Sequence, residues 1–258
     1  MSKFVLVDRG ECAERHWKRP VGYAFASGDT IAPLVLGELA AALFSFPVAF
    51  VRERERFELV AVLSCLSNRN LFVAENGGWR GRYIPVALRA YPFRFFDSGT
   101  PGQKVLCIAE DSLLPAGQTG APFFEPGSSN LTQDVRATVE LLEHAERSRL
   151  QTAAAIDALV EADVIIEWPI TVGSAAGQSQ LTGLFRIDEE RLSALSNEAF
   201  LNLRTAGALA LAYGQLYSLR QIEVFSQLVG AISAPATQRP ASLAEVFHLH
   251  QEPTLRFD

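Results

Sequence analysis

Short apolar runs bounded by charged or turn-forming residues dominate the first half of the chain. Residues 45–52 and 57–65 are rich in aromatic and β-branched side chains, and the four charged residues 53–56 separate them. Such runs are typical of strands, and neighbouring charges of opposite sign are typical of a solvated turn. The pattern predicts an antiparallel hairpin over residues 45–65.

A second hairpin is predicted farther along this half. Residues 70–73 and 79–84 are apolar or aromatic segments, and Asn76 and Gly77 lie between them. Asn-Gly accepts the positive φ that a tight turn requires. Residues 70–84 are therefore predicted to form two strands around this turn.

The remaining strands of the first half are predicted at residues 91–96 and 104–109. Residues 112–130, which follow them, are rich in Pro, Gly and Ser. This composition favours a loop that wraps the body of the protein. Phe123 and Phe124 are expected to anchor it.

Helix-forming residues dominate the second half. Residues 132–163 contain no interior Pro or Gly and place Val135, Val139 and Leu142 at helical spacing. This spacing predicts one long helix or a broken pair. A second helical region is predicted over residues 189–229.

Two strands are predicted between these helical regions, at residues 164–171 and 181–187. Asp188 and Ser196 are expected to cap the helices that follow, because short polar side chains accept hydrogen bonds from free N–H groups at helix starts. The order of elements predicts an α+β fold, with a curved and mainly antiparallel sheet covered by helices of the C-terminal half. We expect a single domain over residues 1–232 and a tail over residues 233–258.

The composition is that of a folded globular protein. Hydrophobic residues make up 48% and charged residues 20% of the 258 residues, which predicts a sizeable core. The 29 acidic residues exceed the 23 basic ones and give a formal charge of -6. Phosphate contacts depend on Lys and Arg, so we expect no nucleic-acid partner.

No segment predicts a membrane partner or an export signal. Residues 31–51 form the longest stretch of low charge but contain Glu38 and two prolines, whereas a helical span needs about 20 apolar residues. The apolar run 4–7 is too short for the core of a signal peptide. We therefore expect a cytoplasmic protein with reduced cysteines, namely Cys12, Cys65 and Cys107.

The sequence holds few metal ligands in a useful arrangement. His248, His250 and Glu252 come nearest to a metal-binding group, and Cys12 and His16 form a second pair. A closed zinc site needs about four ligands, so we expect no metal. Motifs for nucleotide cofactors, Walker-type phosphate loops, nucleophile elbows and zinc proteases are missing from the sequence, and we expect no cofactor.

The densest chemical signal lies in residues 79–93, where aromatic side chains alternate with arginines. Guanidinium groups bind carboxylates in a bidentate manner and stack on rings. A functional interpretation makes this segment the wall of a pocket for an anionic or peptide-like ligand. The predicted ligand-binding residues are Trp79, Arg82, Tyr83, Arg89 and Tyr91.

Two alternatives to this pocket stay open. In the first, the aromatic residues belong to the sheet core and the arginines are structural partners of Glu38, Asp97 or Asp111. In the second, the protein is an enzyme that needs few cofactors and modifies a peptide or small metabolite. The acids of such an enzyme would come from Glu38, Asp111, Glu167 and Asp188, and a pair within about 5–10 Å would be required.

Several segments occur in the order found in the bacterial SapC family, which is named after a protein of a surface-layer gene region. They are Phe-Pro-Val-Ala-Phe at 46–50, Asn-Leu-Phe-Val at 70–73, Trp-x-x-x-Tyr-Ile-Pro at 79–85, Arg-x-Tyr-Pro-Phe at 89–93 and Leu-Thr-Gly-Leu-Phe-Arg-Ile-Asp at 181–188. The resemblance spans residues 15–229. Near its end the family usually has His-Leu-x-Ser-Leu, whereas this chain has Gln215 in place of the histidine.

The resemblance implies an accessory role more than a reaction. Members of the family are often encoded near TonB-dependent receptors, flavin-dependent halogenase-like proteins and cupin-like proteins, and no catalytic residues carry over. We expect a non-enzymatic cytoplasmic binding protein for an imported or modified peptide or a small anionic ligand. A homodimer is a further expectation, because Gly207 and Gly214 are seven residues apart and would share a face of one helix.

Overall fold

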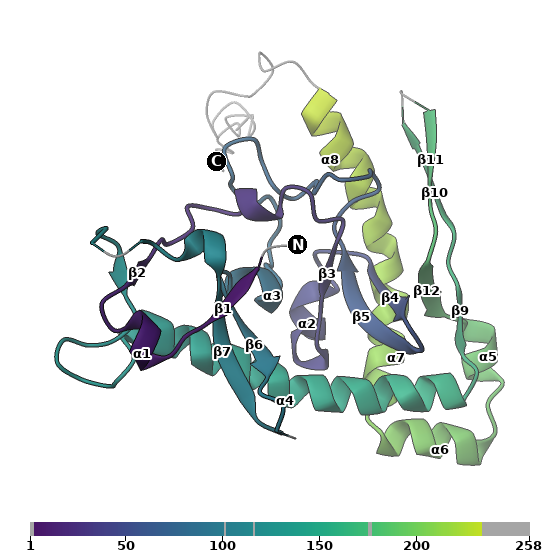
Figure 1. Cartoon of the computed structure of the whole chain (residues 1–258). Coiled ribbons are helices and arrows are strands. Elements are labelled where there is room, and N and C mark those ends of the chain that lie inside the picture. The colour runs from purple at the N-terminus through teal and green to yellow at the C-terminus, as the bar shows by residue number, and fades with distance from the viewer. Residues whose placement is uncertain (1–2, 101, 116, 175–176, 234–258) are drawn as a thin grey trace, which may run out of the picture.

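Two antiparallel sheets and one long helix organise the computed structural model of the chain (Figure 1). The structure describes residues 3–100, 102–115, 117–174 and 177–233. The predicted α+β class, with antiparallel strands and helices in the second half, is confirmed. The predicted tail and its His248, His250 and Glu252 lie outside the described residues.

The large sheet has five strands in the order β3-β5-β4-β12-β9. Its strands are β3 (Ile31–Pro33), β4 (Val48–Glu53), β5 (Arg56–Val62), β9 (Ile165–Glu167) and β12 (Leu184–Ile187). The first predicted hairpin is confirmed as β4 and β5, which pair from Val48 with Ala61 to Glu53 with Arg56. β3 and β9 are the two edge strands.

The small sheet has the order β1-β7-β6, so that β6 is one of its edges. Its strands are β1 (Phe4–Leu6), β6 (Phe93–Asp97) and β7 (Lys104–Ala109). The two predicted strands of this region are thus confirmed as a hairpin. Two further pairs are β2 (His16–Trp17) with β8 (Ala121–Pro122), and β10 (Ile170–Ser174) with β11 (Gly177–Leu181).

The helices vary from single turns to eight turns. The α-helices are α1 (Arg9–Cys12), α2 (Leu39–Ala42), α3 (Val86–Arg89), α4 (Gln133–Glu161), α5 (Glu189–Ser193), α6 (Asn197–Thr205), α7 (Ala208–Ser218) and α8 (Glu223–Ser233). The 3-10 helices are η1 (Ala24–Ala26), η2 (Leu36–Glu38), η3 (Glu110–Ser112) and η4 (Leu219–Ile222). No helix in the described part is long and apolar enough to cross a membrane.

The single helix α4 packs against both cores. Val135 is buried beside the small sheet with Phe93, Ile108 and Phe123. Ala155, Ile156 and Leu159, at the other end of α4, belong to the core of the large sheet. The 29 residues of α4 span about 43 Å at 1.5 Å per residue, and Figure 1 shows the helix crossing the molecule from the small sheet toward β9.

The predicted second hairpin is wrong as a pair of strands. Gly77 does adopt a positive φ of 79° in the turn, but only one isolated bridge, between Val73 and Trp79, forms around it. The indole N–H of Trp79 donates instead to the carbonyl oxygen of Tyr83 at 2.7 Å. This local contact folds residues 79–83 back on themselves, and α3 follows.

The helical region after residue 188 is divided into α5, α6, α7, η4 and α8. Both predicted caps are confirmed: the carboxylate of Asp188 accepts from the backbone N–H groups of Glu190 and Arg191, and the hydroxyl of Ser196 accepts from that of Ala199. Gly207 has a φ of 70° and lies between α6 and α7. The chain therefore changes direction there instead of continuing as one helix.

Gly207 and Gly214 do not share the face of one helix, contrary to our expectation. Gly207 precedes α7, whereas Gly214 lies within α7 and is buried. A Cβ atom at Gly214 would lie 2.6 Å from Cδ2 of Leu39 in α2. The close approach at Gly214 is thus made within the chain, and the homodimer stays a prediction.

Gln215 joins α7 to the middle of the large sheet. Its Oε1 accepts from the backbone N–H of Ile187 at 2.9 Å, and its Nε2 donates to the carbonyl oxygen of Val48 at 3.0 Å. β12 and β4 pair at Leu184 with Val51 and at Phe185 with Phe50. Continued by two residues, this register would place Ile187 opposite Val48. The fully buried amide of Gln215 satisfies their backbone groups in place of a direct bond.

Candidate functional site

A buried carboxylate lies beneath the segment that the sequence singled out. Glu38 is 6% exposed. Its Oε1 accepts from the hydroxyl of Tyr83 at 2.8 Å and from the backbone N–H of Val86 at 2.7 Å, and its Oε2 accepts from the N–H of Val35 at 3.1 Å. The carboxylate therefore ties η2 to residues 83–86.

The helix α4 holds η2, and with it Glu38, in place. The backbone N–H of Leu36 donates to Thr152 Oγ1 at 2.7 Å, and that of Gly37 donates to Ser148 Oγ at 2.8 Å. Ser148 and Thr152 are buried polar residues on the side of α4 that faces η2. Two otherwise free donors at the start of η2 are satisfied in this way.

Tyr83 and Arg89 extend this cluster toward the surface. Arg89 Nη2 donates to the hydroxyl of Tyr83 at 3.2 Å, and the guanidinium lies 5.4 Å from the centre of the Tyr83 ring. Burial, followed by the negative charge of Glu38, raises the pKa of Tyr83 to about 12, although Arg89 acts in the opposite direction. The hydroxyl of Tyr83 is therefore a neutral donor to Glu38.

Trp79 belongs to an aromatic cluster of the large core. Its ring stacks on Phe72 at 5.6 Å between centroids and meets Tyr23 and Phe46 edge-on. With its indole N–H bound to Tyr83, the side chain of Trp79 is fully engaged within the fold. This placement agrees with the structural alternative for this residue.

Arg82 and Tyr91 lie apart from the Glu38 cluster. Arg82 is exposed, and no described residue forms a hydrogen bond or ion pair with its guanidinium. The ring of Tyr91 stacks on Phe25 at 3.8 Å, and its hydroxyl donates to Asp111 at 3.2 Å. Burial and then Asp111 raise the pKa of Tyr91, while a hydrogen bond with Ser112 acts against this rise.

A groove of about 670 Å³, which we call the β6 groove, lies near these residues. It lies between β6, α3, the end of β3 and the middle of α4. Of the five predicted ligand-binding residues, only Tyr91 lines it. Its lining comprises Phe4, Phe25, Asp29, Pro33, Leu34, Val35, Glu38, Val86, Ala87, Leu88, Ala90, Tyr91, Phe93, Arg94, Phe95, Phe96, Asp97, Lys104, Leu142, Ala145, Glu146 and Arg149.

Charged side chains gather at one end of the β6 groove. Lys104 Nζ lies 2.8 Å from Asp97 Oδ1 and 3.4 Å from Glu146 Oε1, and Arg149 makes two hydrogen bonds to Glu146 at 2.7 and 2.8 Å. Arg149 is the main cause of the lowered pKa of Glu146, and Lys104 adds to it. Lys104 likewise lowers the pKa of Asp97.

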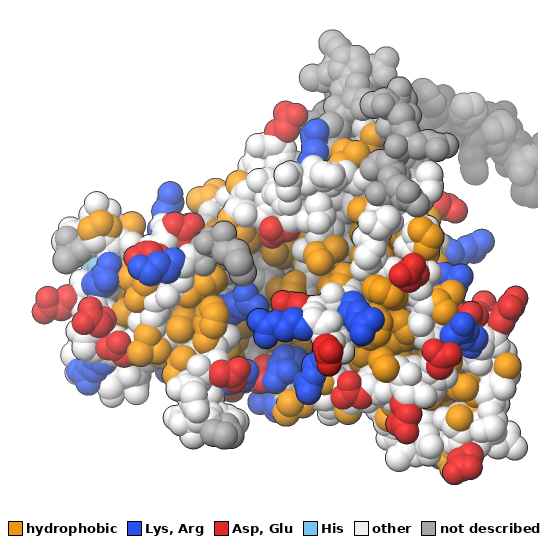
Figure 2. All heavy atoms as spheres, turned by 45° about the vertical axis from the view of Figure 1, so that its right-hand side comes forward, with side chains coloured by type: hydrophobic (Ala, Val, Ile, Leu, Met, Phe, Trp, Pro, Cys, Tyr) orange, Lys and Arg blue, Asp and Glu red, His pale blue; other side chains and the backbone are white. Residues whose placement is uncertain are grey.

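Arg94 differs from the other cations of the β6 groove because none of the described acidic residues pairs with it. Its guanidinium lies 5.6 Å from the centre of the Phe96 ring. Figure 2 shows Lys and Arg side chains in the middle of one face, with Asp and Glu side chains among them and hydrophobic side chains on both sides. A surface of this kind suits a ligand with an apolar body and a negative charge.

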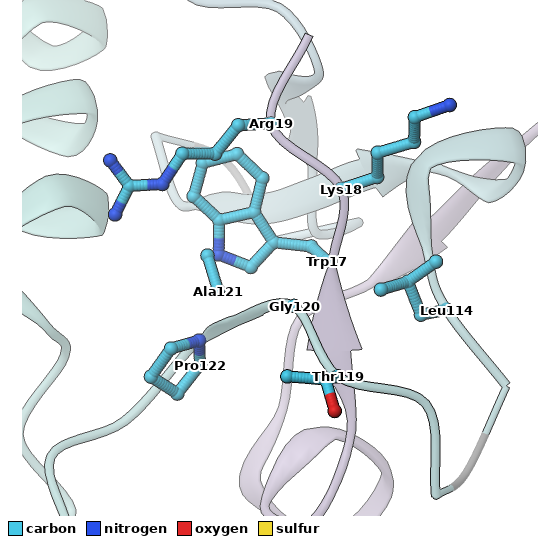
Figure 3. A pocket seen from close by; sticks show the side chains of 8 residues that line it. All are labelled: Trp17, Lys18, Arg19, Leu114, Thr119, Gly120, Ala121 and Pro122. Atoms are coloured by element: carbon cyan, nitrogen blue, oxygen red, sulfur yellow. The ribbon is translucent and has the colours of Figure 1, made fainter.

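A second hollow, of about 620 Å³, lies beside the β2–β8 pair (Figure 3). Its cations are Lys18 and Arg19, and Figure 3 shows their side chains pointing apart. Arg19 is already paired with Asp134, and the indole N–H of Trp17 is buried without a hydrogen-bond partner among the described residues. Because these donors do not converge on one point, we favour the β6 groove as the candidate site.

The four acids of the enzyme alternative lie on different elements and have different surroundings. Glu38 ends η2, Asp111 lies in η3, Glu167 is exposed on the edge strand β9, and Asp188 caps α5. Glu38 and Asp188 are held by backbone N–H groups, and Asp111 by Tyr91. No two of these carboxylates share a described hydrogen-bonding partner.

Potential metal ligands are dispersed in the same way. Within the described ranges, no group of three or more His, Cys, Asp or Glu residues is arranged to hold an ion. Cys12, Cys65 and Cys107 are buried and form no disulfide with any described residue, and burial raises the pKa of each of them. Their surroundings therefore disfavour the thiolate form.

Sequence reasoning missed the cations that line the β6 groove. Arg94 follows Tyr91 by only three residues, and its place in an alternating Phe-Arg-Phe-Phe segment was a usable signal. Lys104 and Arg149 come from β7 and α4. Their convergence on the groove depends on tertiary packing that spacing along the chain does not indicate.

Comparison with known families supports the resemblance seen in the sequence. The SapC family model matches residues 7–224, which covers well over half of the chain. Searches of curated proteins and of solved structures gave no match. From the extent of the family match, the chain belongs to the SapC family.

Proposed function

We propose that this SapC-family protein is a non-enzymatic binding protein whose β6 groove takes a peptide or a small anionic ligand with an apolar body. Its accessory role in the cytoplasm, in handling an imported or modified ligand, follows the expectation from the family resemblance. The observation that carries the proposal is the guanidinium of Arg94, which lies in a largely apolar groove and has no acid partner among the described residues. Binding sites of about 300–1,000 Å³ with apolar walls and few polar groups are typical for small ligands.

The groove combines two sources of affinity. Phe95, Leu88 and Leu142 offer apolar surface, and burying such surface contributes about 25 cal/mol per Å². Arg94 offers charged donors that have no acid partner within the described ranges. A ligand carboxylate or sulfonate at this point gains a charge-assisted hydrogen bond without breaking an existing ion pair.

The test uses the fluorescent anion 8-anilinonaphthalene-1-sulfonate, which has an apolar ring system and one negative charge. We expect saturable binding to the native protein. The variant Arg94→Gln should weaken it about tenfold, which corresponds to about 1.4 kcal/mol. The matched control Arg82→Gln removes an exposed arginine that does not line the β6 groove and should leave the affinity unchanged.

A second pair of variants locates the probe. Ala87 is exposed and lines the β6 groove, so Ala87→Trp should fill the groove and abolish binding. Ala194→Trp places the same ring on an exposed site outside the groove. Equal binding by Ala87→Trp and Ala194→Trp, with melting temperatures that match the parent protein, would overturn the proposal.

A further inference from the structure

One side of the β6 backbone has few hydrogen bonds to the described residues. The geometry of the β6–β7 ladder identifies which side this is. The N–H of Ala109 donates to the carbonyl of Pro92 at 2.9 Å, and the N–H of Ser98 donates to that of Gln103 at 3.0 Å. In an antiparallel ladder, residues alternate between directing their backbone groups toward the partner strand and away from it. Pro92 and Ser98 point toward β7, so the odd-numbered residues of β6 point away.

Several backbone groups on this outer side are open with respect to the described residues. The N–H of Phe93 donates to the carbonyl of Ala90 at 2.8 Å. The N–H and C=O of Phe95 and the N–H of Asp97 have no hydrogen bond to the described residues. β6 therefore presents an unpaired donor and acceptor in the arrangement that another strand would complete.

The β6 groove runs along this open side. All five residues Phe93–Asp97 line it. Successive side chains of a strand point to opposite faces of the sheet, and the ring of Phe96 packs against that of Phe4, while Phe93 is buried against Trp17 and Phe123 on the other face. Residues from both faces line one groove because the groove lies at the edge of the strand.

We propose that the β6 groove binds an extended peptide segment of another protein, which adds as a strand to the open side of β6. This inference rests on the proposed binding function and narrows its ligand. Peptide recognition by strand addition draws its affinity from backbone hydrogen bonds and its specificity from alternate side chains. Five residues of β6 accommodate a segment of about 17 Å at 3.4 Å per residue.

The chemistry of the groove defines the segment. Apolar side chains at alternate positions of the peptide would face Leu88, Phe95 and Leu142. An acidic residue would pair with Arg94, while Lys104 and Arg149 keep Asp97 and Glu146 as partners. The expected ligand is therefore an extended, alternating segment with a carboxylate opposite Arg94, and not a helix.

The test measures binding of the fluorescein-labelled peptide Thr-Val-Thr-Val-Glu-Val-Thr to the full chain by fluorescence anisotropy. Two further peptides carry N-methyl groups, one on the odd-numbered and one on the even-numbered residues. Only one of these sets donates to β6 in a strand pairing. We expect one methylated peptide to lose at least tenfold in affinity and the other to bind like the parent peptide.

Variants of the protein test the same contact from the other side. Phe95→Pro removes the open N–H donor, and proline is tolerated where the N–H of an edge strand is unpaired. Phe95→Ala removes the ring and keeps the donor. We expect Phe95→Pro to bind the peptide at least tenfold more weakly than Phe95→Ala does.

The other possible results show which part of the proposal is wrong. Equal affinity for both methylated peptides, or an equal loss for both, would overturn strand addition. Binding of the anilinonaphthalene probe but not of the parent peptide would overturn the peptide ligand and leave the proposed function standing, whereas binding of neither would remove both. A dimer by light scattering that Phe95→Pro abolishes and Phe95→Ala retains would assign the edge to a second copy of this chain, against the proposal.

Discussion

The hydroxyl of Tyr83 donates to Oε1 of the buried Glu38 carboxylate at 2.8 Å, and Oε1 of Glu38 also accepts from the backbone N–H of Val86 at 2.7 Å. One side chain of η2 thereby fixes the start of α3, which forms a wall of the β6 groove. A residue that the sequence offered as a catalytic acid thus has a clear structural role. This role leads to the first prediction.

Replacing Glu38 by Ala should destabilise the protein by about 2–4 kcal/mol, because it leaves the partly or fully buried N–H donors of Val35 and Val86 unpaired. Urea unfolding monitored by tryptophan fluorescence measures the change. Glu75→Ala, at an exposed position of a turn, is the control and should have little effect. Equal midpoints for the two variants would contradict the structural role of Glu38.

The ionisation of Tyr83 should be visible at alkaline pH. The pKa of its hydroxyl is raised from 10.0 to about 12, and the neutral form is the donor to Glu38. The stability from this contact is complete below pH 10 and is lost as the pH rises toward 12. Difference absorbance at 295 nm should show a tyrosine that titrates near pH 12 and that Tyr83→Phe removes. Titration of that group near pH 10 would contradict the arrangement.

Adding a methyl group at Gly214 should be costly, because its Cβ would lie 2.6 Å from Cδ2 and 3.0 Å from Cγ of Leu39. We expect Gly214→Ala to lower the free energy of unfolding by about 1–3 kcal/mol. Gly230→Ala in α8 meets no heavy atom within 4 Å and should raise it by about 0.5–1 kcal/mol, as expected for an exposed helical position. Loss of stability in both variants alike would rule out the contact with Leu39 as the cause.

Both the acceptor and the donor of the Gln215 side-chain amide should be needed for stability. Gln215→Leu leaves the buried backbone groups of Ile187 and Val48 unpaired, and we expect a loss of about 2–5 kcal/mol. Gln215→His restores the residue usual in the family, and a neutral imidazole keeps one acceptor and one donor.

The histidine variant should be sensitive to acid, unlike the parent protein at this position. Protonation removes the acceptor for Ile187, so the folded state lowers the pKa of the imidazole below its usual value of about 6.5. Above that pH the variant should retain its stability, and it should lose stability as the pH falls below it. If the difference in free energy of unfolding between Gln215→His and the parent protein is the same at pH 8 and pH 5, this role of residue 215 is contradicted.

Local patterns predicted the elements that depend on neighbouring residues. The β4–β5 hairpin, the helical region that contains α4 and the caps Asp188 and Ser196 follow from runs of strand-forming residues, helix propensity and short-range hydrogen bonds. The strand predicted at 79–84 failed because the indole of Trp79 finds its partner four residues away, at the carbonyl of Tyr83. Strand propensity takes no account of such a hydrogen bond between a side chain and the backbone.

The site was less predictable than the fold, because its parts are distant in sequence. Tyr91 and Glu38 line the β6 groove, but Arg94, Lys104 and Arg149 reach it from three elements. Arg89 looked like a ligand-binding group, and the structure pairs it with Tyr83. Spacing along the chain identified the chemistry of this region but not which of its arginines lines the β6 groove.

The sharing of α4 by both cores has a consequence for any attempt to divide the chain. A fragment that stops before α4 would leave the small sheet without Val135, and one that starts at α4 would leave Val135 itself bare to water. Neither piece would keep its apolar surfaces covered, so we expect both to aggregate when they are expressed alone. Cutting this protein into halves is therefore a poor route to isolating its binding surface.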